Sequence, residues 1–152
     1  MDAHLNFDFE VLVKMTHKEL VKIAEGARLN AYAPYSSFLV GAALLCTDGT
    51  VYEGCNIENA SYTPTCCAER VALFKAVSEG KRDFEAIAVV GGKAGSTDND
   101  FCYPCGVCRQ ALSEFCSPQM EVILADGKQE VLELTLADLL PYSFKLTTDG
   151  SK

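Results

Sequence analysis

The stretch FLVGAALLCTDGTVYEGC, residues 38–55, decides the fold of this chain. Its first half, residues 38–46, is an apolar run typical of a buried β-strand. Asp48-Gly49 is a dipeptide that favours a tight hairpin turn, and residues 51–55 follow it as a second strand segment. The stretch therefore predicts an antiparallel β-hairpin.

Helices and strands alternate on both sides of this hairpin. Thr16 and Glu19 form a capping box before a helical apolar pattern that Ala33-Pro34 ends. The expected helices cover residues 18–32, 67–79, 104–115 and 135–140, and the expected strands 84–91, 121–125 and 130–133, with loops at 56–66 and 92–103. Alternating strands and helices predict an α/β class, and the hairpin makes the sheet mixed.

Length and composition restrict the class of protein. A chain of 152 residues, 49% of them hydrophobic, fits one globular domain, with 1–15 as a lead-in and 141–152 as a tail. The N-terminal segment is acidic and lacks a signal-peptide pattern, and no apolar run suits a membrane span, so we expect a cytoplasmic protein. His4 and His17 are expected to be surface residues.

Charge and cysteine content restrict the partners. The formal net charge of −8 disfavours nucleic acid, because binding to phosphates relies on Lys and Arg, and it fits a small neutral substrate better. We see no Gly-rich phosphate loop or arginine clamp near the motifs, so phosphorylated substrates are not expected. Without a secretory signal, the eight cysteines are expected to be thiols or metal ligands.

Two short motifs carry the chemistry. Cys67-Ala68-Glu69 and Pro104-Cys105-Gly106-Val107-Cys108 each stand at the start of a predicted helix. Helix N-termini favour thiolates, so two neighbouring helices would direct Cys67, Cys105 and Cys108 at one metal ion. Three protein ligands leave one tetrahedral position for water, as in catalytic zinc sites, where zinc lowers the pKa of that water to about 7.

Charged residues beside the ligands complete this prediction. Glu69 is expected to move protons between water and the substrate. Arg70 and Arg109 are expected to offset the negative charge of three thiolates by hydrogen bonding to sulfur, although either arginine would serve equally well in a surface ion pair. A ligand-x-Glu motif followed by Pro-Cys-x-x-Cys is the signature of zinc-dependent base deaminases.

At this point the chain resembles the small homotetrameric cytidine deaminases. The resemblance rests on motifs from the first strand to the second cysteine motif: Ala33-Pro34-Tyr35-Ser36, Phe38, Val40-Gly41-Ala42, residues 54–62, Cys67-Ala68-Glu69-Arg70 and Pro104-Cys105-Gly106-x-Cys108-Arg109-Gln110. It covers roughly residues 18–145 and implies a three-layer α/β/α fold with a mixed sheet of about five strands. It also implies one Zn²⁺ per subunit.

The resemblance implies a reaction and a role for each matching residue. The reaction is hydrolysis of cytidine or 2′-deoxycytidine to uridine or 2′-deoxyuridine with release of ammonia, in pyrimidine salvage. Family members share active sites between the subunits of a homotetramer. The implied substrate contacts are Phe38 against the base, Asn56 and Glu58 on the ribose hydroxyls, the Ala68 backbone on the pyrimidine, and Ala60, Tyr62 and Phe144 contributing from a neighbouring subunit.

Three other readings remain open from the residues. A related zinc deaminase would act on blasticidin S, free cytosine or a polynucleotide, but Asn56-x-Glu58 favours a ribose and the acidity disfavours a polynucleotide. A structural zinc module would need a fourth ligand, Cys66 or Cys102. A thiol redox protein would use Cys105 and Cys108 and would leave Glu69 without a role.

Overall fold

The computed structural model describes residues 14–146, which form four helices and five strands. The helices are α1 (His17–Arg28), α2 (Ala68–Ser78), α3 (Gly106–Phe115) and α4 (Leu136–Leu139), and the strands are β1 (Phe38–Cys46), β2 (Val51–Cys55), β3 (Phe84–Lys93), β4 (Glu121–Ala125) and β5 (Val131–Thr135). None of the helices in this part of the chain is long and apolar enough to cross a membrane. The lead-in before residue 14, including His4, and the tail after residue 146 lie outside the described residues.

The five strands form one mixed sheet in the order β2-β1-β3-β4-β5. β1 pairs antiparallel with β2 and β3, β3 pairs parallel with β4, and β4 pairs antiparallel with β5. The hairpin register places Leu45 opposite Val51 and Gly41 opposite Cys55. The predicted hairpin and the mixed five-stranded sheet are thus confirmed, with β1 and β2 at their predicted bounds.

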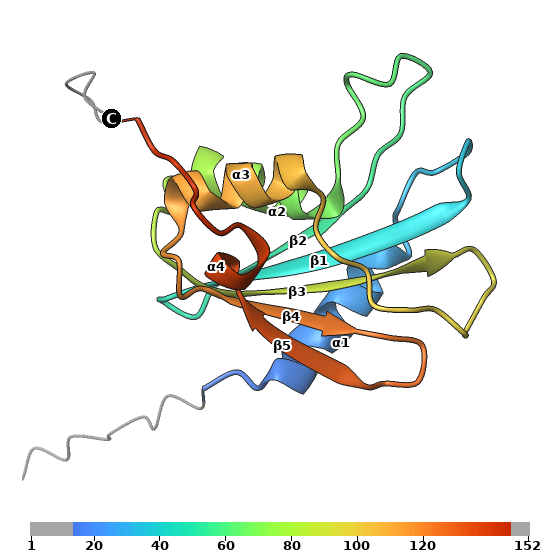
Figure 1. Ribbon diagram of the computed structural model, residues 1–152. Helices are drawn as coiled ribbons and strands as arrows, with labels where there is room; N and C mark the ends of the chain where they lie inside the picture. The colour runs from blue at the N-terminus through green and yellow to red at the C-terminus, as the bar shows by residue number, and fades with distance from the viewer. Residues whose placement is uncertain (1–13, 147–152) are drawn as a thin grey trace, which may run out of the picture.

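Helices cover both faces of this sheet and make three layers (Figure 1). α2 and α3 pack on one face, where Leu44, Val89 and Leu124 are buried, and α1 packs on the other against Leu45 and Ile123. Because successive residues of a strand point to opposite faces, a strand buried on both sides reads as a continuous apolar run. This explains why the pattern of β1 does not alternate between polar and apolar residues.

The first helix ends earlier than the sequence predicts. We expected residues 18–32, but α1 stops at Arg28, with Leu29 as its C-cap. The backbone of Tyr32 instead donates to Asn56 O (2.9 Å) and accepts from Glu58 N (2.8 Å). Because of these long-range hydrogen bonds, residues 29–34 leave the helix and lie against the loop after β2. The local hydrophobic periodicity of the sequence gives no sign of this pairing.

Other boundaries shift by a few residues. The capping box of Thr16 and Glu19 is present, and Gly80 adopts a φ of 91° just after α2, as its predicted cap position requires. α3 begins at Gly106 rather than at Pro104, because Cys105 is its N-cap. α4 begins after Thr135, which caps it together with Asp138.

Candidate active site

The first turns of α2 and α3 bring three thiols together. Cys67 is the N-cap residue of α2 and Cys105 the N-cap residue of α3, while Cys108 lies one turn into α3 and is fully buried. The Cys67 and Cys105 Sγ atoms lie 3.7 Å apart, and the Cys105 and Cys108 Sγ atoms 3.5 Å apart. All three sulfur atoms lie within 4.8 Å of one another. Two helix starts that are distant in sequence thus form one three-sulfur cluster.

The spacing of the three sulfurs fits a tetrahedral metal ion. Zn–S bonds of about 2.3 Å at tetrahedral angles would separate two sulfurs by roughly 3.8 Å. Among the described residues, the group able to hold a metal consists of Cys67, Cys105 and Cys108, without Cys66 or Cys102. Three ligands and an open fourth position are the arrangement of a catalytic zinc site rather than a structural one. The cluster therefore fits one zinc ion per chain.

Electrostatics at the cluster favour a thiolate at Cys67. A hydrogen bond from Cys108 lowers the pKa of the Cys67 thiol to about 5, and the guanidinium of Arg70 adds to this effect. The same hydrogen bond, together with burial, raises the pKa of Cys108. At neutral pH Cys67 is therefore ready to bind a cation.

Glu69 is a buried carboxyl group beside the cluster. It lies in the first turn of α2 and is only 3% exposed. Burial raises the pKa of Glu69 to about 7, since water no longer stabilises the carboxylate. A carboxyl group with a pKa near neutrality both accepts and donates protons readily, as a proton shuttle requires.

The two arginines beside the ligands make different contacts. Arg70 Nη2 donates to the Thr65 carbonyl at 3.1 Å and lies 3.8 Å from Cys67 Sγ, which is the kind of sulfur contact we expected. Arg109 donates instead to the carbonyls of Pro104 and Leu139, both at 2.7 Å. In the described residues Arg109 has no hydrogen bond to sulfur, because its side chain extends towards α4. It ties the second cysteine motif to that helix.

Phe38 lies at the start of β1, over Gly91 of β3. A Cβ atom at Gly91 would lie 3.1 Å from Phe38 Cε1 and 2.6 Å from Cys102 Sγ. Phe38 and Cys102 therefore share the space left by the missing side chain. Burial raises the pKa of Cys102 to about 12, so its thiol stays protonated and acts as a packing group. The sequence predicted a substrate contact for Phe38, but it did not predict that Cys102 would pack in the same region.

Asn56 and Glu58 are held against the start of β1. The side chain of Asn56 accepts from Val40 N at 2.8 Å and donates to Phe38 O at 2.8 Å, much as a neighbouring strand would. Glu58 accepts from Tyr35 N at 2.8 Å. Each side chain keeps further hydrogen-bonding capacity. The two polar groups predicted to bind a sugar are thus fixed in the same region as Phe38.

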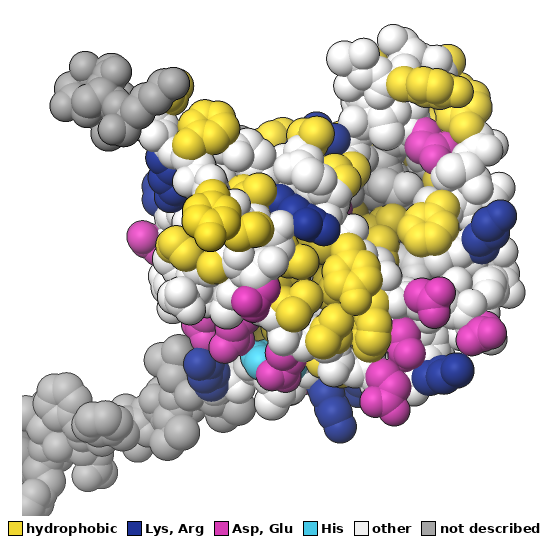
Figure 2. All heavy atoms as spheres, in the orientation of Figure 1, with side chains coloured by type: hydrophobic (Ala, Val, Ile, Leu, Met, Phe, Trp, Pro, Cys, Tyr) yellow, Lys and Arg dark blue, Asp and Glu magenta, His cyan; other side chains and the backbone are white. Residues whose placement is uncertain are grey.

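The remaining predicted contacts are spread over the chain. Ala68 is fully buried at the start of α2, whereas Tyr62 and Phe144 are 82% and 64% exposed. The loop 56–67 between β2 and α2, which contains Ala60 and Tyr62, projects beyond the sheet, while the segment 141–146 after α4, which contains Phe144, runs along the opposite side of the view (Figure 1). Figure 2 shows apolar side chains exposed on the same face. A single chain does not bring Tyr62 and Phe144 together.

A cavity of about 370 Å³ lies beside Glu58, lined by Tyr35, Ser36, Glu58, Asn59, Tyr62 and Thr65. It joins the turn before β1 to the projecting loop. Since Glu58 lines it, this cavity adjoins the polar side of the candidate site.

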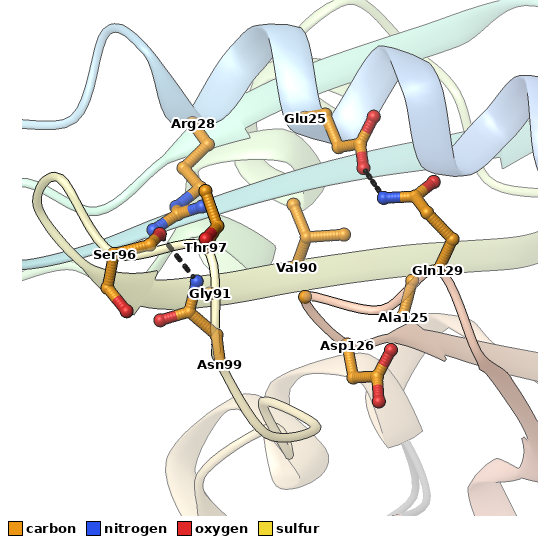
Figure 3. Close-up of a pocket in the computed structure, with 11 residues that line it drawn as sticks. Glu25, Arg28, Val90, Gly91, Ser96, Thr97, Asn99, Ala125, Asp126 and Gln129 are labelled. Atoms are coloured by element: carbon orange, nitrogen blue, oxygen red, sulfur yellow. Dashed lines mark hydrogen bonds between the residues drawn. The ribbon is translucent and has the colours of Figure 1, made fainter.

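The long loop before the second cysteine motif is packed down rather than open. Gly127 N donates to Asn99 O at 2.8 Å, and the Asn99 side chain occupies the space over Gly92. This loop closes one side of a separate cavity of about 170 Å³ between α1, the end of β3 and the turn at 126–129 (Figure 3). None of the predicted site residues lines that cavity. The sequence predicted a loop at 92–103, and the structure shows that this loop is a hydrogen-bonded segment that leads into Pro104.

Comparison with known proteins identifies the family. Residues 14–124 match the family model described as the cytidine and deoxycytidylate deaminase zinc-binding region. The chain belongs to the cytidine deaminase family. A cytidine deaminase of Sporosarcina psychrophila is 51% identical over 130 residues, which cover 86% of this chain and 92% of that protein. The crystal structure of cytidine deaminase from Burkholderia pseudomallei superposes with a TM-score of 0.78 at 49% identity, covering 86% of this chain and all of that one.

A more distant relative of this chain is named for a different substrate. Blasticidin-S deaminase of Bacillus cereus is 31% identical over 108 residues, covering 69% of this chain and 76% of that protein. The higher identity to proteins named cytidine deaminase favours the nucleoside reading. The match to a zinc-binding region argues against a thiol redox protein. The group of three thiols, which lacks a fourth protein ligand among the described residues, argues against a structural zinc module.

Two contacts of the site were not predicted from the sequence. The Ser36 hydroxyl donates to Glu58, and Cys102 shares the space over Gly91 with Phe38. Ser36 stands in a Pro-Tyr-Ser-Ser stretch, where serine hydroxyls commonly bond to nearby groups, and this pattern is the only local signal for its role. The place of Cys102 depends on the long-range packing of its loop on β3, which no local pattern encodes.

Proposed function

We propose that this chain catalyses the zinc-dependent hydrolytic deamination of cytidine and 2′-deoxycytidine, giving uridine or 2′-deoxyuridine and ammonia. The observation that carries the proposal is a buried Glu69 two residues after a ligand of a three-thiol cluster with an open fourth position. The family match and the identity of about half to proteins named cytidine deaminase support the same reaction. Such a reaction belongs to pyrimidine salvage.

In this proposal Cys67, Cys105 and Cys108 hold the zinc ion. Bound there, zinc supplies a Lewis acid that makes a water molecule acidic enough to react at neutral pH. Glu69 takes a proton from the water that adds to C4 of the base, and it gives that proton to N3. Glu69 then carries the second proton to the 4-amino group, so that the C4–N bond breaks and ammonia leaves.

Substrate binding is assigned to the groups around β1 and the start of α2. Phe38 packs against the base, the backbone of Ala68 orients the pyrimidine, and Asn56 and Glu58 bind the ribose hydroxyls. An amide and a carboxylate that are already fixed by the protein lose little freedom when a diol binds to them. Arg70 moderates the charge at Cys67.

The assembly and location belong to the same proposal. We infer a homotetramer of single-domain chains in which Ala60, Tyr62 and Phe144 complete the site of a neighbouring subunit. Support comes from the exposure of Tyr62 and Phe144 and from their separation within one chain. Eight free cysteines suit a reducing compartment, which supports a cytoplasmic location. A small nucleoside, rather than nucleic acid or a membrane, is the expected partner.

The decisive experiment follows the ultraviolet absorbance of cytidine on mixing with the purified protein. A Glu69→Gln variant and a zinc assay accompany it. We expect the wild type to convert cytidine, and the variant to be about 10²–10⁴-fold slower because the proton shuttle is lost. About one zinc per chain in both proteins would exclude loss of metal as the cause.

One result would redirect the proposal to another substrate. Zinc in the wild type without conversion of cytidine or deoxycytidine would point to a different amine, and blasticidin S would be the next substrate tested. Equal rates for wild type and Glu69→Gln would remove Glu69 from the reaction.

A further inference from the structure

The turn before β1 carries an unusual backbone conformation. Ser37 has a φ of 56°, in the left-handed region that residues other than glycine rarely adopt. Two backbone hydrogen bonds hold it there, from Ser37 N to Ala33 O at 3.0 Å and from Ala94 N to Ser37 O at 2.8 Å. Such a conformation persists where the surroundings fix it, so the position of Ser36 is closely defined.

The Ser36 hydroxyl joins two predicted substrate contacts. It donates its only proton to Glu58 Oε1 and accepts from Phe38 N at 3.0 Å. A directed chain of hydrogen bonds therefore runs from the Phe38 backbone through one hydroxyl to the Glu58 carboxylate. In the described residues, Ser36 is the side chain that touches both groups.

The Glu58 carboxylate is fixed mainly through this turn. Besides the Ser36 hydroxyl, Tyr35 N and Ser36 N donate to Oε2 at 2.8 Å and 3.2 Å. The hydrogen bond from Ser36 is the largest cause of the lowered pKa of Glu58, and the backbone donors add to it. Donors that stabilise the charged form also restrict where the carboxylate points.

We propose that Ser36 is a positioning residue, whose hydroxyl fixes the Glu58 carboxylate relative to Phe38. The inference rests on the proposed function, in which Glu58 binds the sugar and Phe38 packs against the base. Asn56 already ties its own segment to Phe38 and Val40 through two hydrogen bonds. Ser36 supplies the corresponding tie for Glu58. The two ends of a nucleoside thus meet groups that are held at one spacing before it arrives.

The test compares steady-state kinetics on cytidine for the wild type and five zinc-loaded variants. Ser36→Ala removes the hydroxyl, and Ser36→Thr keeps it. Ser37→Ala makes the same chemical change one residue further, where the structure gives the hydroxyl no hydrogen bond within residues 14–146. Glu58→Ala alone and combined with Ser36→Ala completes a double-mutant cycle. Zinc content and the unfolding midpoint are measured for every variant.

We expect Ser36→Ala to raise KM about tenfold, with kcat within about threefold of wild type, because one hydrogen bond to a charged group is lost. Ser36→Thr and Ser37→Ala should stay within about threefold of wild type, since both leave the Glu58 contact intact. Once Glu58 is absent, Ser36→Ala should have no further effect, because a positioning residue acts through its partner.

Two outcomes would overturn the role of Ser36 and leave the proposed function standing. One is an unchanged KM in Ser36→Ala with an active wild type. The other is a double variant whose fold-change in KM equals the product of the fold-changes of the two single variants, which would mean that Ser36 acts independently of Glu58. An inactive wild type with full zinc would instead overturn the proposed function, and the role of Ser36 with it.

Discussion

At the scale of single residues, one missing side chain shapes the proposed base-binding side of the site. At position 91 only glycine leaves room for both Cys102 Sγ and the Phe38 ring, since a Cβ atom at Gly91 would lie 2.6 Å from the sulfur. The proposal that Phe38 packs against the base therefore extends to Gly91, which lies beneath it.

A Gly91→Ala variant tests this arrangement. We expect kcat/KM for cytidine to fall about tenfold, because overpacking of this size displaces neighbouring groups at a cost of roughly 1–3 kcal/mol. Adding Cys102→Ala should recover part of the loss by removing the closest contact. Gly26→Ala on α1 is the matched control, since a Cβ there meets nothing within 4 Å. An unchanged kcat/KM in Gly91→Ala would contradict the prediction.

The cysteine and glutamate positions were predictable at this scale, whereas their neighbours were not. Cys67, Cys105, Cys108 and Glu69 stand at spacings set by helix geometry, so the sequence alone brings them to two helix starts. The contacts of Arg109 were not predictable, because a long side chain chooses among partners that only the tertiary structure supplies. Its actual acceptor on α4 lies 30 residues further along the chain.

At the scale of secondary-structure elements, two glycines dock helices on opposite faces of the sheet. A Cβ at Gly41 would lie 2.0 Å from Ala24 O of α1, and one at Gly54 would lie 2.2 Å from Ala68 O of α2. Both clashes involve helix backbone, which cannot move aside without moving the helix. Of the two helices, α2 carries Cys67 at its start together with Glu69.

Replacing either glycine with alanine should lower the stability of the fold, but only one of the two replacements should also weaken metal binding. We expect both variants to unfold at lower temperature, with losses of roughly 1–3 kcal/mol or more. Only Gly54→Ala should also bind less than one zinc per chain after dialysis, because it displaces the start of α2. The measurements are thermal unfolding and zinc per chain. Equal zinc retention in the two variants would show that α2 moves without disturbing the cluster.

His17 connects α1 to the far edge of the sheet. Its ring nitrogens lie 2.6 Å from Glu133 Oε1 and 2.8 Å from Glu121 Oε2, on β5 and β4. The hydrogen bond to Glu133 is the largest cause that raises the pKa of His17. His17 is a surface residue, as predicted, and its side chain is 35% exposed. The ion pairs join elements more than 100 residues apart.

The His17 contacts should stabilise the fold in a pH-dependent way. A raised pKa in the folded state means that this contribution is fully present below the unfolded pKa of about 6.5. It is lost as the pH rises through the folded-state pKa. We expect His17→Gln to lower the unfolding free energy by roughly 0.5–1 kcal/mol near pH 6, since the groups are partly exposed, and by less at pH 9. Denaturant unfolding from pH 5.5 to 9 measures this, and a difference that grows with pH would contradict it.

The element boundaries show where sequence patterns stop being informative. β1 and β2 have their predicted bounds because the apolar run and the Asp48-Gly49 turn act locally. α1 ends four residues before the predicted Tyr32, which pairs with the loop after β2. That pairing offers backbone hydrogen bonds equivalent to those of another helical turn, so periodicity could not distinguish the two.

At the scale of the whole molecule, the proposed tetramer would complete the candidate site. The sulfur cluster, Glu69, Phe38, Asn56 and Glu58 come from one chain, but Tyr62 is mostly exposed on the projecting loop. Within residues 14–146, the carbonyl of Phe144 accepts from Gln110 Nε2 of α3 at 3.4 Å, and most of the Phe144 side chain is exposed. Large exposed aromatic side chains are typical of surfaces that another subunit covers. We therefore expect them to be buried in the proposed tetramer.

Mixed assemblies provide a direct test of shared sites. Phe144→Ala chains keep Glu69, and Glu69→Gln chains keep Phe144, so a mixed tetramer forms some sites that contain both. If Phe144 acts on a neighbour, co-assembly in equal amounts should restore wild-type-like sites to about half of the Phe144→Ala chains, since each has an even chance of an intact neighbour. Activity per Phe144→Ala chain should then rise above that of the pure variant.

The control for mixed assembly combines wild-type chains with Glu69→Gln chains, in which activity per wild-type chain should not change. Size-exclusion chromatography with light scattering confirms that each preparation has the same mass. If Phe144 served its own chain, mixing would leave the Phe144→Ala activity unchanged, because no exchange of neighbours alters a site built within one chain. A fully active pure Phe144→Ala variant would remove the residue from the site altogether. Of these outcomes, only recovery of activity on mixing requires a site built from two chains, because a site built within one chain would not change when its neighbours are exchanged.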